Sequence, residues 1–177
     1  MSLDFKRILC PVDMSPFSRE AIKLGVKLAQ NSPATLYLLH VIDNPFDELY
    51  LSSITQADPA LLDLYRDEPS KRARIMNATL EHSQVLLKQF CHEWVEHLPK
   101  VRYLVANGNP FEKILDAAKD HRIDLIVLAT HGRTGVKRLL IGNVAEKVVR
   151  HAPCPVLTLK PRVTTPKGSE TKSTRRG

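Results

Sequence analysis

Two glycines and a helix start, all between residues 124 and 146, are the part of the chain whose residue types most clearly indicate chemistry. Gly132 is followed, after nine residues, by Gly142 and then by Asn143. Asn143 at an N-cap position, with Glu146 three residues later, resembles a capping box and predicts a helix that begins near Asn143. The unpaired N–H groups and the positive dipole end of a helix start attract anions, and a neighbouring glycine lets an oxygen approach the backbone.

Three basic side chains in the same loop would add positive charge beside that helix start: Arg133, Lys137 and Arg138. The bland alternative is an ordinary capped helix that follows a flexible loop with a solvated basic face. Glycine loops before helices are common, so spacing alone leaves both interpretations open.

The strands and helices that position this loop alternate along the chain. Short apolar runs predict strands at 7–13, 35–42, 100–106, 124–129 and 155–160, and apolar periodicity predicts helices at 16–30, at 71–96, from 110 and from about 143. This alternation favours an α/β fold, in which an open parallel sheet has helices on both faces. Residues 43–70 show no clean periodicity.

The same periodicity predicts which side of each helix is buried. Ser15 should cap the first helix before Pro16, and the turn at 108–110 should start the third. The apolar positions are Phe17, Ala21, Leu24 and Leu28 in the first helix, Ile75, Leu80, Val85, Leu86, Phe90 and Trp94 in the long one, and Phe111, Ile114, Leu115 and Ala118 in the third.

Ligands of an open parallel sheet bind beyond the carboxyl ends of the strands, where the strand order reverses. The candidates there are Asp13 after the first strand, Val41 and Ile42 at the end of the second, and the loop after Ala129. Asp13 could instead cap the following turn through its side chain. His131 could contact a phosphate or carry a proton, or serve only as a turn residue.

Other polar residues receive structural interpretations. Asp124 starts its strand at the opposite edge of the sheet, and His40 lies within a strand, so we expect the first to be structural and the second to be packed. Cys10 lies in an apolar run and is expected to be a buried, unreactive thiol. Pro153-Cys154-Pro155 directs the chain into the last strand and implies no chemistry.

The residues Ala129-Thr130-His131-Gly132, then Gly142-Asn143 after nine more, resemble the nucleotide-binding pattern of the universal stress protein family. In that pattern a glycine, two residues, a glycine, nine residues, a glycine and Ser or Thr cradle the phosphates of ATP. The segment THGRTGVKRLLIGNVAEKVVRHAPCPVLTL resembles the C-terminal signature of the family, and ILCPVDMSPFSREA resembles its N-terminal one.

The resemblance implies a Rossmann-like fold of the adenine nucleotide α-hydrolase type, with five strands in the order 3-2-1-4-5. It implies one domain at 1–160 that binds ATP or stays empty, depending on the subgroup of the family. We expect ATP, or AMP or ADP in its place, with Mg²⁺ carried by the phosphates. The expected function is a nucleotide-dependent regulatory or stress-response switch with little or no hydrolysis, paired as a homodimer through the last strand, Val156–Leu159.

Carried over by position, Asp13 and Val41 would contact the base or ribose, while Gly132, Arg133, Gly142 and Asn143 would line the phosphates. The full expected set is Pro11, Val12, Asp13, Val41, Leu128, Ala129, His131, Gly132, Arg133, Gly142, Asn143 and Val144. Two positions depart from the family pattern, since Ala129 replaces its first glycine and Asn143 replaces Ser or Thr. Asparagine would still cap the helix and can offer an amide N–H to a phosphate oxygen.

Two alternative functions compete with the switch. The departures at Ala129 and Asn143 leave a nucleotide-free dimerising adaptor open as an alternative. A nucleotidyltransferase or ATP pyrophosphatase would carry an HxGH-type or SGGxDS-type loop after the first strand, where residues 10–15 read CPVDMS. The chain also lacks GxxxxGK[ST] and GxGxxG motifs, so neither P-loop hydrolysis nor dinucleotide redox chemistry is supported. We expect no catalytic residue and no metal ligand from the protein.

Composition sets the remaining expectations. The 177 residues are 43% hydrophobic, which suits one soluble cytoplasmic domain, with no long apolar run and no signal peptide. The three cysteines show no metal or redox spacing. Residues 161–177 carry five basic side chains and one acidic side chain of a chain with net charge +7, so we expect a disordered basic tail rather than a nucleic-acid-binding protein.

Overall fold

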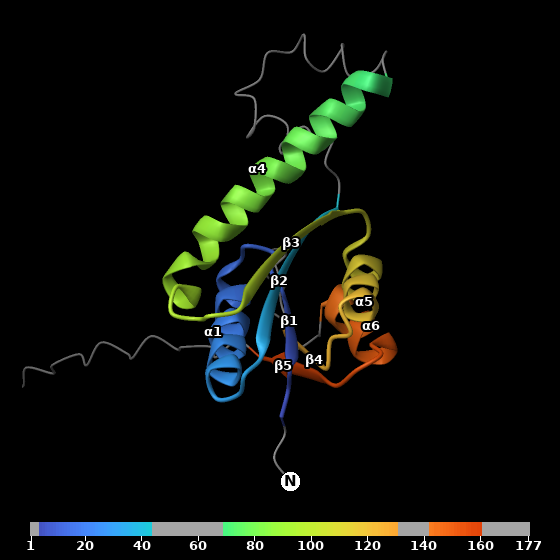
Figure 1. The fold of residues 1–177 in the computed structure, drawn as a ribbon. Helices are drawn as coiled ribbons and strands as arrows, with labels where there is room; N and C mark the ends of the chain where they lie inside the picture. The colour runs from blue at the N-terminus through green and yellow to red at the C-terminus, as the bar shows by residue number, and fades with distance from the viewer. Residues whose placement is uncertain (1–3, 44–68, 131–141, 161–177) are drawn as a thin grey trace, which may run out of the picture.

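The computed structural model describes residues 4–43, 69–130 and 142–160. Its strands are β1 (Arg7–Pro11), β2 (Thr35–Ile42), β3 (Val101–Asn107), β4 (Leu125–Ala129) and β5 (Val156–Leu159). They form one parallel sheet in the order β3-β2-β1-β4-β5 (Figure 1). The predicted α/β class and strand order are therefore confirmed, with strand ends that differ by one or two residues.

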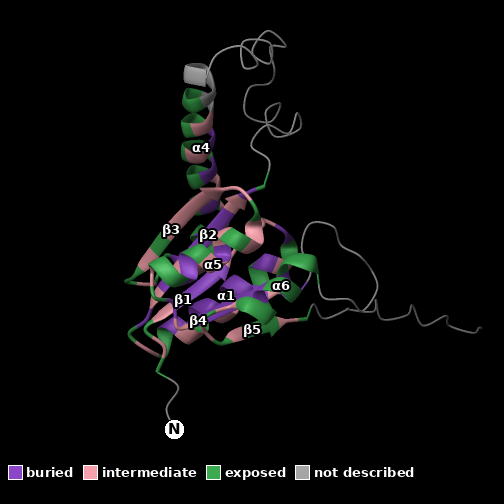
Figure 2. Cartoon of the chain, turned by 90° about the vertical axis from the view of Figure 1, so that its right-hand side faces the viewer, coloured by how far each residue is buried: buried purple, intermediate pink, exposed green. Residues whose placement is uncertain are grey.

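Helices cover both faces of this sheet. They are α1 (Pro16–Gln30), α4 (Pro69–Val95), α5 (Pro110–Asp120) and α6 (Asn143–His151). Helices α1 and α4 lie on one face, and α5 and α6 lie on the other (Figure 1). The amino-terminal half of α4 extends past the end of the sheet (Figures 1 and 2).

Alternate residues of the central strands supply two separate cores. Ile8 and Cys10 of β1 pack toward α1 and α4, whereas Leu9 between them packs toward α5 and α6. Ile8, Leu9 and Cys10 are all fully buried, so both faces of β1 are covered between its half-buried ends, as expected for a strand at the centre of a parallel sheet. Figure 2 shows these central strands as mostly buried.

Local sequence signals set two of the helix starts as predicted. Ser15 is the N-cap of α1, where its Oγ accepts a hydrogen bond from the Ser18 N–H at 3.3 Å. Asn109 is the N-cap of α5, and its Oδ1 accepts from the Phe111 N–H at 3.0 Å. Gly108 precedes it with φ of +127°, a conformation that favours glycine.

The buried side of α1 is shifted from the predicted one. Ala21 is buried as expected, but Leu24 and Leu28 are only half-buried, and Gly25 faces the sheet instead. A Cβ added at Gly25 would collide with the Cys10 Sγ. The helix therefore approaches the sheet through its small residues, and its larger side chains flank the contact.

The predicted apolar face of α4 is wrong at Val85, which is 50% exposed. The residues that the helix buries recur every four positions: Thr79, Ser83, Leu87, Cys91 and Val95. Two of these five are hydroxyl residues, so a search for apolar periodicity misses them. The side chain of Ile75 lies outside the described residues.

Candidate functional site

The carboxyl ends of three neighbouring strands meet at one edge of the sheet. Strand β1 pairs with β2 on one side and with β4 on the other, so the strand order reverses between β1 and β4. Pro11, Ile42 and Ala129 end these three strands. The structure therefore brings the predicted positions after β1, β2 and β4 to a single edge, which is where open parallel sheets bind ligands.

Asp13 organises the turn that follows β1. Its Oδ1 accepts hydrogen bonds from the Ser15 N–H at 3.0 Å and from the Ser15 Oγ at 2.6 Å. Met14 between them has φ of +61°, a left-handed conformation that is rare for a residue with a side chain. The turn-capping interpretation of Asp13 is thus confirmed, and the same bonds hold its carboxylate at the sheet edge.

The side chains of Val12 and Leu128 point into the two cores. Val12 is 3% exposed in the core beneath α1 and α4, and Leu128 is 4% exposed in the core beneath α5 and α6. Val41 and Ala129 are half-buried at the same edge. Any contribution of Val12 and Leu128 to a ligand site would therefore come from their backbone or from the shape that they support.

The start of α6 differs from the predicted capping box. Gly142 is the N-cap, with φ of −59° and ψ of 148°, and in the part of the chain that the structure describes no side chain caps the helix. Asn143 is already the first helical residue, one position too late for its side chain to cap, and Glu146 pairs with Arg150 at 3.1 Å instead. The prediction that Asn143 caps the helix is wrong. The first intrahelical bond joins the Glu146 N–H to the Gly142 carbonyl at 2.9 Å, so the preceding amides have no acceptor within the helix.

Thr130 ties this helix start to the sheet. Its carbonyl accepts from the Gly142 N–H at 2.7 Å, while its own N–H and Oγ1 both donate to the Leu159 carbonyl, at 2.9 and 3.1 Å. A Cβ on Gly142 would lie 3.2 Å from the Thr130 carbonyl oxygen, closer than most Cβ contacts. The residue at 142 must be small because the helix start lies directly against β4.

His40 is packed, as predicted. It is 7% exposed, and its Nδ1 lies 2.7 Å from the Val12 carbonyl oxygen. Asp124 is structural, also as predicted, because its carboxylate accepts from the N–H groups of Lys6 and Arg7 at 2.9 to 3.1 Å. The bonds of Thr130 have no counterpart in the sequence pattern, because a lone threonine after a strand carries no signal that could have revealed them.

Several predicted residues lie outside the described residues: His131, Gly132, Arg133, Lys137 and Arg138. The basic tail at 161–177 and most of 43–70 also lie outside them. The described part of the candidate site consists of the strand edge and the start of α6.

The cysteines are free thiols in apolar surroundings. Burial, together with the nearby Cys91, raises the pKa of Cys10, and burial raises the pKa of Cys91 from 9.0 to about 12. Both thiols therefore stay protonated at neutral pH, which confirms that Cys10 is a buried, unreactive thiol. Burial also raises the pKa of Cys154, with Asp124 adding to the effect.

Neither a metal cluster nor a membrane-spanning helix is found among the described residues. No group of three or more His, Cys, Asp or Glu side chains there is placed to hold a metal ion. None of the helices in the described ranges is both long enough and apolar enough to cross a membrane.

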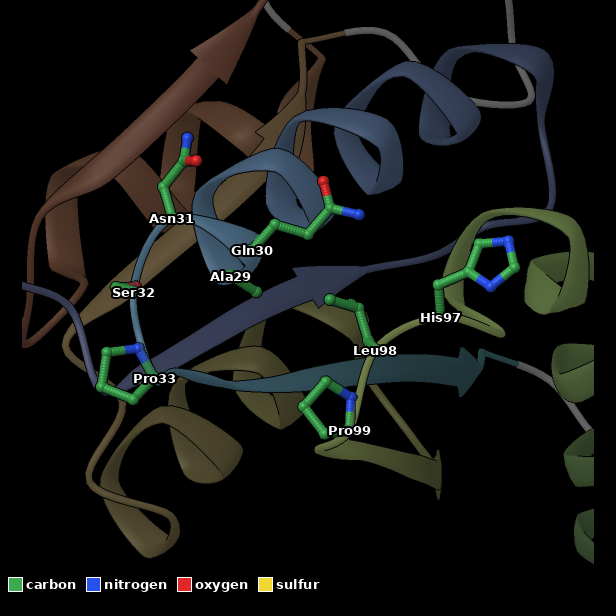
Figure 3. A pocket seen from close by; sticks show the side chains of 8 residues that line it. All are labelled: Ala29, Gln30, Asn31, Ser32, Pro33, His97, Leu98 and Pro99. Carbon is green, nitrogen blue, oxygen red and sulfur yellow. The ribbon is translucent and has the colours of Figure 1, made fainter.

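An open hollow of about 500 Å³ lies at the opposite edge of the sheet (Figure 3). It is lined by the end of α1 and the turn before β3: Ala29, Gln30, Asn31, Ser32, Pro33, His97, Leu98 and Pro99. These residues precede β2 and β3, so the hollow is at the amino edge and is separate from the candidate site. Of its lining side chains only His97 is ionisable, and it lies 3.2 Å from Glu96.

Fold and site together define a Rossmann-like α/β protein with an uncapped helix start at the carboxyl edge of its sheet. The sequence model of the universal stress protein family matches residues 4–160. The universal stress protein MJ0531 of Methanocaldococcus jannaschii is 32% identical over 157 residues, covering 88% of this chain and 82% of that protein. The chain belongs to the universal stress protein family.

Solved structures agree with this assignment. The structure of MJ0577 from the same organism superimposes with a TM-score of 0.68 at 27% identity, covering 90% of this chain and 99% of that one. An Arabidopsis thaliana family member with AMP bound gives a TM-score of 0.53 at 20% identity over 89% of this chain and 93% of its own. A universal stress protein in complex with cAMP gives a TM-score of 0.53 at 17% identity, covering 89% of this chain and 98% of its own. At these two lower identities the likeness concerns the fold.

Proposed function

We propose that this chain binds an adenine nucleotide, ATP in the first place, at the carboxyl edge of its sheet. In this proposal it acts as a nucleotide-dependent regulatory switch in a stress response. Asp13 and Val41 contact the base or ribose, and Gly142, Asn143 and Val144 hold the phosphates together with Gly132 and Arg133. Mg²⁺ arrives with the phosphates of the nucleotide.

The uncapped start of α6 carries the proposal. Among the described residues no side chain accepts from its first amides, and Gly142 brings them against the end of β4, where a Cβ would be crowded. A phosphate oxygen is the kind of acceptor that such amides and a helix dipole attract. Because Asn143 is not the cap, its amide side chain is left available for the ligand instead of for the helix.

The ligands named for other family structures support an adenine nucleotide over other anions. AMP and cAMP, each named for one of those structures, share the adenosine that Asp13 and Val41 would contact. Asp13 follows β1 and Val41 is near the end of β2. These two strands are neighbours in the sheet, in which residues such as Pro11 and Leu39 pair directly. A base and ribose can therefore bind between two strand ends whose separation the sheet sets.

We propose little or no hydrolysis. Asp13 commits one oxygen to two bonds with Ser15, and Glu146 pairs with Arg150 on the exposed side of α6. Neither carboxylate is arranged as a base that would activate water for attack on a phosphate. Slow hydrolysis should be assayed with Gly142→Val as the control, because a contaminating ATPase would survive that change.

The nucleotide-free adaptor is the second candidate, and the alanine at 129 is the observation that favours it. Ala129 is half-buried at the end of β4, where the family pattern has glycine. Denaturing the purified protein and chromatographing what is released separates the two functions. We expect adenine nucleotide in the supernatant, or a rise in Tm when ATP and Mg²⁺ are added to an empty preparation. An empty protein whose Tm does not respond to millimolar ATP would instead be the adaptor.

We also propose that two chains pair through β5, in the cytoplasm. Strand β5 is at one edge of the sheet, and Leu157 is 38% exposed there. The exposed apolar side chain and the outward backbone groups of an edge strand favour pairing with a second strand. In this arrangement residues 1–160 form the dimerising domain.

A further inference from the structure

The imidazole of His40 joins the ends of the two strands that carry the proposed base and ribose positions. Its Nδ1 lies 2.7 Å from the Val12 carbonyl oxygen, and the side chain is 7% exposed. A carbonyl oxygen can only accept a hydrogen bond, so Nδ1 must carry the proton and donate it. The contact is therefore directional, from β2 to the residue after β1.

Val12 is held to β2 at both of its backbone groups. Its N–H donates to the Leu39 carbonyl at 2.7 Å, and its carbonyl accepts from His40. The bond to Leu39 continues the ordinary backbone pairing of β1 and β2. The bond from His40 comes from a side chain, and it links the two strands beyond Pro11, where β1 ends. The peptide unit between Val12 and Asp13 consequently has its orientation fixed from β2.

This peptide unit leads directly into the proposed site. Asp13 follows Val12, and Val41 follows His40, so the bond ties together the residues immediately before both proposed contacts. Asp13 is held again on its other side by Ser15. Without the imidazole, the Val12 carbonyl would lose its side-chain donor and the peptide could rotate toward water.

We propose that His40 is a positioning residue for the nucleotide. Its Nδ1–H holds the Val12 carbonyl and thereby sets the spacing of Asp13 and Val41, between which the base and ribose bind. The inference rests on the proposed nucleotide site and assigns His40 no contact with the ligand. The position of His40 inside β2 would otherwise indicate only a packing role.

Three substitutions separate positioning from packing. The side-chain nitrogen of Asn lies near the position of a histidine Nδ1, whereas that of Gln reaches the position of Nε2, and Leu has no donor. We expect His40→Asn to keep ATP affinity within about threefold of the wild type, and His40→Gln and His40→Leu to weaken it by about tenfold or more. Isothermal titration with ATP and Mg²⁺, paired with the Tm of each nucleotide-free variant, measures both effects.

Cys91→Ala is the matched control. Cys91 is fully buried in the same core as Val12, and its removal should lower Tm without changing the affinity for ATP. If His40→Leu does not fold, the ATP affinities of His40→Asn and His40→Gln decide between positioning and packing. Both side chains are polar, and only Asn places its donor near the Val12 carbonyl.

The possible outcomes distinguish this inference from the function on which it rests. A wild type that binds no adenine nucleotide overturns both. If the wild type binds, the inference alone is overturned when Gln and Leu keep the wild-type affinity and lower only Tm, or when Asn weakens binding as much as Leu does. Recovery by Asn and loss with Gln supports it.

Discussion

At the scale of single residues, the candidate site is made by main-chain geometry more than by side-chain chemistry. Gly142 has no Cβ, so the helix start can lie close to the Thr130 carbonyl. This carbonyl accepts a hydrogen bond from the Gly142 N–H at 2.7 Å and fixes the helix start. Asp13 commits a carboxylate oxygen to its own turn. Such a site suits a ligand that brings its own charge and needs amide donors, as a phosphate does.

Gly142→Ala tests this main-chain role. The added methyl would lie 3.2 Å from the Thr130 carbonyl oxygen, so the start of α6 must move by a few tenths of an ångström. We expect the affinity for ATP to fall about tenfold, while the free energy of unfolding changes by no more than about 1 kcal/mol, because φ of −59° suits alanine and only the N-cap preference is lost.

The control for Gly142→Ala is Val149→Ala, on the exposed part of the same helix. Val149 is 47% exposed, so its truncation should leave both affinity and Tm unchanged. Titration calorimetry and thermal denaturation give the two quantities. Unchanged ATP affinity in Gly142→Ala would show that the helix start does not hold the phosphates.

At the scale of elements, helix α1 is set against the sheet by small residues. Gly25 faces the Cys10 Sγ and the Leu36 Cδ1, and an added Cβ would overlap the sulfur. The sequence predicted where α1 starts, because Ser15 and Pro16 are local signals. It predicted the buried side only in part. Ala21 is buried and Leu24 and Leu28 pack against the core, but the close contact is made by Gly25, which has no side chain to contribute to the apolar periodicity.

Gly25→Ala should therefore destabilise the protein, although alanine is the better helix former. We expect a loss of about 1–3 kcal/mol from overpacking, which exceeds the gain of about 1 kcal/mol in helix propensity. Denaturant unfolding measures the difference. Adding Cys10→Ala removes the sulfur and should recover part of the loss, so a double variant whose destabilisation is the simple sum of the two would contradict this packing.

The buried thiols on β1 and α4 predict how stability depends on pH. Burial raises the pKa of Cys91 to about 12 in the folded chain, against 9.0 for an ordinary thiol. Above pH 9 the unfolded chain releases protons that the folded chain retains, so stability should fall as pH rises from about 9 to 12, by at most about 1.4 kcal/mol per pH unit for each thiol.

Urea unfolding of the wild type and of Cys91→Ala between pH 7 and 10.5 measures this dependence. We expect the alanine variant to lose less stability above pH 9 than the wild type does. Identical slopes for the two proteins would mean that Cys91 ionises as readily in the folded chain as in the unfolded one.

At the scale of the whole molecule, the sequence was sufficient for the architecture. Apolar runs predicted the strands, and the family resemblance implied their order, which the sheet confirms. The ligand loop between Gly132 and Gly142 stays a prediction, because residues 131–141 lie outside the described residues. The cap of α6 was predicted at Asn143 instead of Gly142, because a capping box is a local pattern and the bond from Gly142 to Thr130 is a tertiary one. Thr130 and His40 act through contacts with other strands, which no spacing along the chain reveals.

The proposed dimer can be tested on the backbone of β5. The carbonyls of Pro155 and Leu159 accept from the N–H groups of Ile126 in β4 and of Thr130 just after it, at 3.0 and 2.9 Å, so alternation directs the N–H of Thr158 away from β4. Proline at 158 removes this outward donor without removing a bond to β4. We expect Thr158→Pro to be monomeric by light scattering at concentrations where the wild type is dimeric.

Thr158→Val keeps the N–H and serves as the control, and it should remain dimeric. A proline variant that dimerises as well as the wild type would place the contact elsewhere than at β5. A wild type that is monomeric at high micromolar concentration would reject the pairing altogether.

The most direct test of the central claim is a calorimetric titration of the nucleotide-free protein with ATP in the presence of Mg²⁺. We predict saturable binding with one site per chain, and competition by AMP because the two ligands share the adenosine. Absence of binding heat at millimolar ATP, together with no change in Tm, would contradict the nucleotide site.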